Sequence, residues 1–371
     1  MKIIVAPNAF KGSLSPVEAA DAMAEAVVDA MPQAEVVKLP VADGGDGTAE
    51  ILALLLGAEA VACEVHDPMM RPIKGCYYLL PDRRTAVVGI SAASGIALLQ
   101  PSELDAMRAT TYGTGELMLQ AIEAGCTHLI VALGGSATCD GGTGMAQALG
   151  VTFYNRENRP MRQPLCGTTL GDISRYEMPE RLRAIRFTVL CDAEAVMYGP
   201  SGAAYVYAPQ KGASPEQVEQ LDTSLRRYAN VLNSSLSEPI ENQPYTGAAG
   251  ASAATLCGML RGELVSGAEW MLQTVGLDPH LADADLLLTG EGRVDCQSVA
   301  GKSLGTLLRH ATRFGVPVAV MGGAVDLQHE VAGLDTVTIT PNGMPLAEAM
   351  QPEVARRNLR RAVRSYLQHL V

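Results

Sequence analysis

The chain has 371 residues, of which 48% are apolar and 18% charged, and its formal net charge is −12 at pH 7. Two domains are expected, because one hydrophobic core rarely supports this length. The negative charge and the lack of a basic, aromatic-rich stripe argue against binding to nucleic acid or to a membrane surface. The eight cysteines form no CxxC pair and the N-terminus lacks a secretory pattern. These features predict a cytoplasmic protein with reduced thiols and no zinc site.

Five short runs are apolar throughout, as in the buried strands of a parallel sheet. They are residues 2–6, 35–41, 285–289, 316–321 and 336–340. An amphipathic helix should follow the first run, opening with a capping box made by Ser15 and Glu18, with Pro16 at the first helical position. Another amphipathic helix should end the chain. This alternation predicts a flavodoxin-like, doubly wound parallel α/β sheet.

Roughly two hundred residues separate the second apolar run from the third, which is too long for a loop and predicts an inserted second α/β domain. The insert opens with three strand-like segments that form an antiparallel meander, at 63–68, 76–80 and 85–91. Further strands are expected at 128–135, 187–193 and 204–209, and a helix should follow a second capping box of Ser214 and Gln217. We therefore expect a discontinuous flavodoxin-like domain at 1–60 plus 265–371, and an inserted domain with a mixed sheet at 61–264.

Four glycine-rich segments follow predicted strands, at 42–48, 133–145, 288–303 and 321–324. In open α/β sheets such turns present backbone amides and helix N-termini to an anion. Glycine turns can also merely end strands, but four with embedded acidic residues favour a binding role. A Walker A loop is not supported, because Cys296 stands where its first glycine should be, and Gln147 interrupts a Rossmann fingerprint.

Carboxylates lie in or beside these turns, where Mg²⁺ bridging them to nucleotide phosphates would satisfy their charge. The metal candidates are Asp43, Asp46, Asp140, Glu291 and Asp295. Helix capping is the alternative for each of them. Lys11, Lys211, Arg293 and Lys302 are cations in similar settings, which could bind phosphate or a substrate carboxylate. Taken singly, each of these cations is more often a surface ion-pair partner.

Six motifs, in order and spread over almost the entire chain, resemble those of the bacterial glycerate kinase family. They are FKGSLS (10–15), PVADGGDGT (40–48), TTYGTGEL (110–117), GGSATCDGGTGMAQALG (134–150), PQKGA (209–213) and LTGEGRVDCQS (288–298). The resemblance implies a two-domain α/β kinase that uses ATP and Mg²⁺ to phosphorylate D-glycerate, usually to 2-phosphoglycerate. The small hydroxy acid and ATP would then be its partners.

Our hypothesis is in-line phosphoryl transfer in a cleft between the two domains. Asp192 is the candidate for accepting the hydroxyl proton, and Lys11 is the second catalytic candidate. The residues expected to bind phosphate or substrate are Ser13, Gly134, Gly135, Ser136, Lys211, Gly290, Gly292 and Arg293.

Four positions depart from the pattern of the family. Asn8 and Gly89 stand where acidic residues are usual, Cys139 replaces an asparagine, and Ala195 lies in a CDAEAVM segment that lacks the usual Asn-Pro. They leave open a kinase for another small hydroxy acid, or a non-catalytic ligand-binding paralogue. The sequence also leaves open which hydroxyl is phosphorylated and the oligomeric state, a homodimer being one option.

Overall fold

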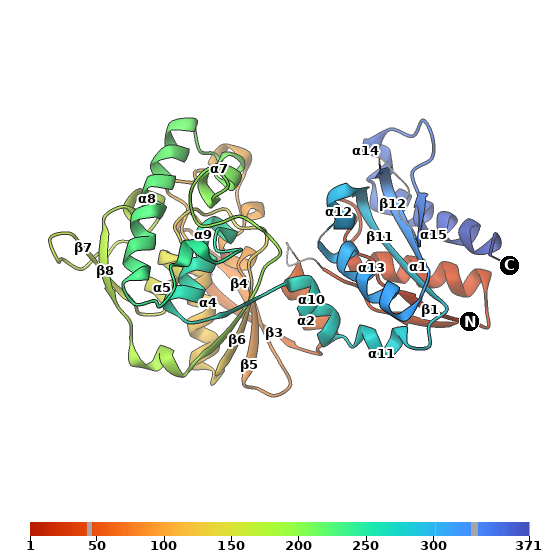
Figure 1. Cartoon of the computed structure of the whole chain (residues 1–371), viewed down its shortest axis with the longest axis horizontal. Helices are drawn as coiled ribbons and strands as arrows, with labels where there is room; N and C mark the ends of the chain where they lie inside the picture. Colours follow the sequence, from red (N-terminus) through yellow and green to blue (C-terminus); the bar gives the residue numbers. More distant parts are fainter. Residues whose placement is uncertain (43–46, 301, 328–332, 371) are drawn as a thin grey trace. The chain divides into compact units, whose positions relative to one another are not determined.

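The structure is a computed structural model that describes residues 1–42, 47–300, 302–327 and 333–370 (Figure 1). The chain divides into two compact units. The first unit is built from both ends of the chain, Met1–Asp43 and Ala268–Val371, and the second is the intervening Gly44–Gly267.

A five-stranded parallel sheet forms the centre of the first unit, in the order β2-β1-β11-β12-β13. The strands are β1 (Lys2–Val5), β2 (Glu35–Lys38), β11 (Leu286–Asp295), β12 (Val318–Asp326) and β13 (Leu334–Thr338). The helices are α1 (Pro16–Ala30), α10 (Gly267–Thr274), α11 (Leu277–Leu281), α12 (Cys296–Ala300), α13 (Lys302–Phe314), α14 (Leu346–Ala349) and α15 (Pro352–Gln368). Counted along this unit, the strand order is 2-1-3-4-5, which is the flavodoxin-like arrangement and confirms the predicted fold class.

The core of the first unit lies between this sheet and the helix pair α1 and α15, which pack side by side (Figure 1). Ile3 and Leu288 from the sheet are fully buried, as are Met23 of α1 and Leu359 of α15. The helices α1 and α15 therefore cover one face of the sheet, as their apolar stripes predict.

The second unit contains a six-stranded mixed sheet in the order β10-β9-β6-β5-β4-β3. Its strands are β3 (Glu59–His66), β4 (Pro72–Leu79), β5 (Thr85–Gly89), β6 (His128–Ala132), β9 (Arg186–Leu190) and β10 (Glu263–Val265), with a separate hairpin of β7 (Thr152–Asn155) and β8 (Ile173–Glu177). The strands β3, β4 and β5 form the expected antiparallel meander, whereas β5, β6, β9 and β10 are parallel. The expected mixed sheet is therefore present.

The main helices of the second unit are α2 (Thr48–Leu55), α3 (Ser91–Ser94), α4 (Tyr112–Glu123), α5 (Thr143–Ala148), α6 (Gly167–Leu170), α7 (Ala203–Tyr207), α8 (Pro215–Asn233) and α9 (Ala248–Ala254). Because α2 packs against β4 and β5, the division into compact units falls near residue 43, earlier than the expected boundary at residue 60. No helix in the described ranges is both long and apolar enough to cross a membrane.

The strand predicted at 204–209 is wrong, because this segment belongs largely to α7. Its alternating tyrosines suggest a strand, yet Tyr205 and Val206 are exposed. Ala203 and Ala204 are fully buried, and α7 packs against α8 and α9. Two small residues let the short helix approach its neighbours closely, and this packing overrides the local β-propensity.

The capping box of α1 gives a testable prediction. The Ser15 hydroxyl accepts from the Glu18 amide at 3.2 Å, and a Glu18 carboxylate oxygen accepts from the Ser15 amide at 2.8 Å. Ser15→Ala should lower the free energy of unfolding at neutral pH by about 1 kcal/mol, measured by urea denaturation. Hydrogen bonds from the Ser15 backbone and hydroxyl lower the pKa of Glu18 below its ordinary 4.5.

A lowered carboxylate pKa means that the stabilisation is present above pH 4.5 and is lost as the pH falls through the pKa of the folded state. The deficit of Ser15→Ala should therefore shrink in acid. Ser15→Asp keeps a capping oxygen and should retain most of the wild-type stability. Equal stability of Ser15→Ala and wild type at neutral pH would contradict this account.

Candidate functional site

The first unit has a pocket of about 800 Å³ at the carboxyl edge of its parallel sheet. It is lined by the segment that follows β1, by the ends of β11 and β12, by the segment that follows β13, and by α14 and the start of α15. In a 2-1-3-4-5 sheet the strand order reverses between β1 and β11, and open α/β proteins bind ligands beside such a reversal. Topology therefore makes this pocket the leading candidate site.

A tight turn over residues 10–14 brings two predicted site residues, Lys11 and Ser13, to the pocket. Lys11 is exposed. The hydroxyl of Ser13 is buried, and it has no hydrogen-bond partner in the part of the chain that the structure describes. Because buried hydroxyls are normally hydrogen-bonded, this one marks a place where a ligand could supply the missing partner.

The sequence predicts a turn in the glycine-rich segment 288–303, but the structure shows a strand over its first half. Instead β11 continues to Asp295, paired in parallel with β12 as far as Asp326. Gly292 and Gly323 allow this close pairing, since a Cβ on Gly323 would lie 2.4 Å from the Gly292 carbonyl oxygen. The glycines of 321–324 likewise lie within β12. These glycines therefore lie in paired strands rather than in a turn, and the roles of Gly290 and Gly292 in binding phosphate or substrate stay predictions.

The extension of β11 places three predicted charged residues along the pocket: Glu291, Arg293 and Asp295. Arg293 is 65% exposed and forms an ion pair with Asp326 at 2.8 Å. A solvent-exposed pair of this kind is weak, so Arg293 can exchange its partner for an anion. The Oδ1 atom of Asp295 accepts from the Ser298 amide at 3.0 Å, at the start of α12.

Other predicted residues contribute backbone or lie beyond the described part of the chain. Gly290 is buried and its carbonyl accepts from the Asn8 amide at 2.8 Å, and Gly292 lines the pocket. Asp43 and Asp46 lie outside the described residues, so their role as metal ligands stays a prediction. Within the described ranges no group of three or more His, Cys, Asp or Glu side chains could hold a metal ion.

In the second unit, the glycine-rich loop 133–145 follows β6 and surrounds the buried Asp140. The carboxylate of Asp140 accepts from the Thr111 amide (2.8 Å) and hydroxyl (2.7 Å), from the Gly142 amide (3.0 Å) and from the Gly144 amide (3.2 Å). Four donors from its own chain satisfy this side chain without a metal. We propose that Asp140 organises the loop, and its role as a metal ligand stays a prediction.

A strained segment packs against this loop and was not predicted. Ala249, Gly250 and Ala251 all have a left-handed backbone, with φ of 53°, 63° and 68°. The Gly141 amide donates to the Gly250 carbonyl at 3.0 Å, and a Cβ on Gly250 would lie 2.0 Å from the Thr138 carbonyl oxygen. Left-handed alanines cost about 1–2 kcal/mol each, so the surrounding packing must hold them. The only local signal was the run of glycine and alanine at 247–254.

Lys211 is a buried lysine whose side chain bonds to two residues of the loop 133–145. Its Nζ donates to the Ser136 hydroxyl and to the Thr138 carbonyl, both at 2.8 Å. The side chain is 3% exposed, and burial lowers the pKa of Lys211. We therefore propose a structural role for Lys211, and its role in binding phosphate or substrate stays a prediction. Gly134 and Gly135 remain half-buried at the start of the loop.

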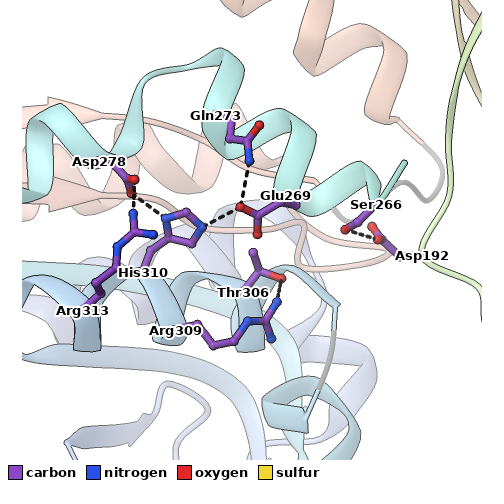
Figure 2. A network of polar contacts seen from close by, with 9 residues as sticks. All are labelled: Asp192, Ser266, Glu269, Gln273, Asp278, Thr306, Arg309, His310 and Arg313. Atoms are coloured by element: carbon purple, nitrogen blue, oxygen red, sulfur yellow. Dashed lines mark hydrogen bonds and ion pairs between the residues drawn. The ribbon is translucent and has the colours of Figure 1, made fainter. Parts of the chain in front are cut away.

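Asp192 is the second residue after β9 and is half-buried. The Ser266 hydroxyl donates to its Oδ1 atom at 2.7 Å (Figure 2). This hydrogen bond orients the carboxylate. Nothing in the sequence pairs these two residues, which are 74 positions apart.

A second network, also shown in Figure 2, centres on the buried His310 of α13. Its Nδ1 lies 2.5 Å from a carboxylate oxygen of Asp278, and its Nε2 lies 3.0 Å from one of Glu269. Arg313 also pairs with Asp278. Both ring nitrogens therefore lie within hydrogen-bonding distance of a carboxylate oxygen. The network fastens α10 and α11 to α13.

Comparison with known proteins decides the family. Residues 3–371 match the model of the glycerate kinase family. The chain belongs to this family. Glycerate 2-kinase of Escherichia coli K12 is 38% identical over 327 residues, covering 88% of this chain and 86% of the relative. Glycerate kinase of Bacillus cereus is 35% identical over 365 residues, covering 97% and 95%.

A solved structure of a similarly named protein is also similar to this chain. The crystal structure of a protein assigned as glycerate kinase 2 from Salmonella typhimurium LT2 is similar with a TM-score of 0.85 and 35% identity. The similarity covers 100% of this chain and 98% of that one. Both compact units therefore belong to the glycerate kinase fold.

Two departures from the family pattern are well accommodated here. Asn8 accepts from the Ala9 amide at 2.7 Å and donates through Nδ2 to the Ser303 hydroxyl at 3.0 Å. A side chain at Gly89 would place its Cβ 3.1 Å from that of Ala49, so the glycine makes room for α2. Asn8 lines the pocket and can affect a ligand directly.

The other two departures are buried. Cys139 is 0% exposed and Ala195 is 8% exposed. The carbonyl of Ala195 accepts from the Gly247 amide at 2.9 Å, close to the strained segment. Both residues therefore act through packing rather than through a solvent-exposed surface.

The proposed structural role of Lys211 can be tested with Lys211→Met, which keeps most of the length of the side chain but removes both hydrogen bonds. Leaving the Thr138 carbonyl without its donor should cost about 1–3 kcal/mol of unfolding free energy, measured by urea denaturation. Lys74→Met, at an exposed position on β4, is the control and should change stability by less than about 0.5 kcal/mol. Wild-type stability of Lys211→Met would exclude the structural role.

Proposed function

We propose that this chain is a cytoplasmic kinase that uses ATP and Mg²⁺ to phosphorylate D-glycerate, giving 2-phosphoglycerate. The observation that carries the proposal is the match to relatives named glycerate kinase and glycerate 2-kinase, at 35% to 38% identity over most of the chain. The family match extends from residue 3 to residue 371, so it includes every segment of the candidate site.

The pocket of the first unit supports a role in holding the triphosphate. Lys11 and Arg293 supply two cations, and the Ser13 hydroxyl supplies a donor that has no partner among the described residues. Glu291 and Asp295 are carboxylates in the same pocket, and Mg²⁺ bound to a nucleotide typically takes one or two carboxylates together with phosphate oxygens. These two residues fit that pattern and would hold the ion. Bound Mg²⁺ would neutralise charge on the transferred phosphoryl group.

In the second unit, Asp192 is the proposed acceptor of the hydroxyl proton, and Ser266 positions its carboxylate. The transition state of phosphoryl transfer is loose, so most of the acceleration comes from placement and charge neutralisation. The base should therefore contribute less than the groups that bind phosphate.

A kinase acting on a different small hydroxy acid is the second candidate. Ala195, which lies three residues after Asp192 in a segment that lacks the usual Asn-Pro, favours it. A panel of hydroxy acids assayed by ADP release separates the two candidates. The proposed function requires D-glycerate to give the highest kcat/KM of the panel.

Product identification tests the reaction directly. Incubation with MgATP and D-glycerate should yield ADP and 2-phosphoglycerate. Phosphorus–proton correlated NMR distinguishes a phosphate on the secondary C2 oxygen from one on the primary C3 oxygen. Omitting Mg²⁺ is the control and should abolish turnover. A 3-phosphate product would refute the assigned position, and no product from any acid would refute the kinase.

Two substitutions test the assigned roles. Lys11→Ala should lower kcat/KM by about 10²–10³-fold, because a cation that binds the developing charge is lost. Asp192→Asn should lower kcat by about 10²-fold, near the lower limit for a general base. Lys38→Ala is the matched control, since Lys38 lies outside the pocket and pairs with Asp21 on the surface. Near-normal turnover in both variants would show that the assigned roles are wrong.

A further inference from the structure

The second unit has a hollow of about 330 Å³ at the amino edge of its mixed sheet, where β9 begins. Three segments line it: the 3₁₀ helix Glu180–Ala184, the start of β9, and the residues that follow the π-helix Thr255–Met259. Each segment contributes one arginine, namely Arg183, Arg186 and Arg261. No carboxylate is among the described residues that line the hollow. The chain therefore gathers positive charge here, although its net charge is −12.

This hollow is separate from the site that the proposed kinase would use. The strand β9 runs from Arg186 to Leu190, so Arg186 is at its start and Asp192 comes after its carboxyl end. Open α/β sheets bind their substrates at the carboxyl edge of the parallel strands. A ligand at the amino edge would therefore be a molecule other than the one that reacts beside Asp192.

Other side chains satisfy the three arginines to different degrees. Arg183 forms an ion pair with Glu180 at 3.3 Å. Arg186 donates through Nη2 to Nδ1 of His128 at 3.3 Å. Burial, followed by the charge of Arg186, lowers the pKa of His128 below its ordinary 6.5, so the imidazole positions Arg186 without adding or cancelling charge at pH 7. Within the described ranges neither Arg186 nor Arg261 forms an ion pair, and two positive charges remain.

The hollow is also lined by hydrocarbon. Leu182, Met259 and Leu260 are buried and belong to the core of the second unit, and Met178 and Ile185 are half-buried against that core. A ligand bound here would meet both guanidinium groups and apolar side chains. Because apolar surroundings lower the local dielectric constant, they strengthen hydrogen bonds between charged partners. The hollow therefore suits a small anion that carries a short apolar body.

The backbone of Arg261 is unusual for an arginine. It is left-handed, with φ of 54°, at the end of a helix, where glycine is the usual residue. The next residue, Gly262, has a packing reason to be glycine, since a Cβ there would lie 3.0 Å from the Leu256 carbonyl oxygen. Neither the turn nor an ion pair in the described part of the chain accounts for an arginine at position 261. Strained residues of this kind cluster at ligand sites.

We infer that this hollow binds a small organic phosphate monoester, with its phosphate held by Arg186 and Arg261 and its carbon skeleton against the apolar lining. A phosphate monoester carries about −1.5 to −2 charges at pH 7, which matches the two unpaired guanidinium groups. A carboxylate carries only one. The planar guanidinium fork also binds two phosphate oxygens at once. The inference goes beyond the proposed kinase reaction and does not require it.

The experiment uses the full-length protein and three probes. n-Propyl phosphate combines a dianion with a short apolar chain, inorganic phosphate lacks the chain, and butyrate carries the same propyl group on a single charge. Isothermal titration measures the dissociation constant of each probe. Wild type should bind n-propyl phosphate more tightly than either of the others. Butyrate binding as tight as that of n-propyl phosphate would refute the preference for a dianion.

Arg261→Gly is the decisive variant, because it removes the guanidinium and relieves the left-handed strain together. Its affinity for n-propyl phosphate should fall about 10- to 100-fold, the range for a hydrogen bond to a charged group. Its Tm without a probe should not fall. Arg83→Gly is the matched control, since Arg83 is also left-handed, with φ of 58°, and lies outside the hollow. The control should bind all three probes as wild type does.

Two further variants grade the contributions of the arginines. Arg186→Gln should weaken binding of n-propyl phosphate by a similar factor, and Arg183→Gln should weaken it less, because Arg183 already pairs with Glu180. Wild-type affinity in both Arg261→Gly and Arg186→Gln would overturn the inference. If these variants bind the probe normally while Lys11→Ala loses it, the anion binds in the first unit. The inference then fails and the kinase proposal stands.

Discussion

The parallel backbone pairing of β1 with β11 is the constraint on which the rest of the first unit depends. It joins Ile3 to Leu286, which the whole second unit separates in sequence. β1 is buried on both faces, so its amides and carbonyls must be satisfied by neighbouring strands. The pairing also places the segments beyond both strands together, as the bond from the Asn8 amide to the Gly290 carbonyl shows. The pocket is thus a consequence of how the two ends of the chain pair.

Much of the fold could be predicted because it depends on short-range patterns. The capping boxes at Ser15 and Ser214 need only residues three apart, and both are present. Buried parallel strands are apolar throughout, which identified β1, β11 and β12, and similar apolar runs identified the less buried edge strands β2 and β13. Prediction failed where tertiary packing determines the secondary structure. In α7, the packing of its buried alanines favours a helix over the strand that its alternating tyrosines suggest. It also failed for the end of β11, because pairing with β12 depends on a distant segment.

Part of the site could also be predicted, because some of its residues belong to short sequence motifs. Lys11, Ser13 and Arg293 belong to motifs, and the structure brings them to one pocket. Asn358 belongs to no motif, and its partner Met344 is 14 positions away. Only the fold therefore reveals that both residues line the pocket. Asp140 and Lys211 are predicted to bind ligands because each lies in a glycine-containing motif. Burial raises the pKa of Asp140 and lowers that of Lys211, because both lose the hydration of their charged forms. Sequence composition cannot report that depth of burial.

The electrostatics of the pocket give a physical reason for the asparagine at position 8. The charged side chains that line it in the described residues are two cations and two carboxylates: Lys11, Arg293, Glu291 and Asp295. The two positive and two negative charges cancel, so the lining of the pocket has no net negative charge that would repel a triphosphate. An aspartate at position 8 could still bond to the Ser303 hydroxyl, but it would add a like charge, worth about 4 kcal/mol at 4 Å for an effective dielectric constant of 20. Asn8 keeps the hydrogen bond and avoids that repulsion. The departure from the family pattern at position 8 is therefore compatible with an anionic ligand in this pocket.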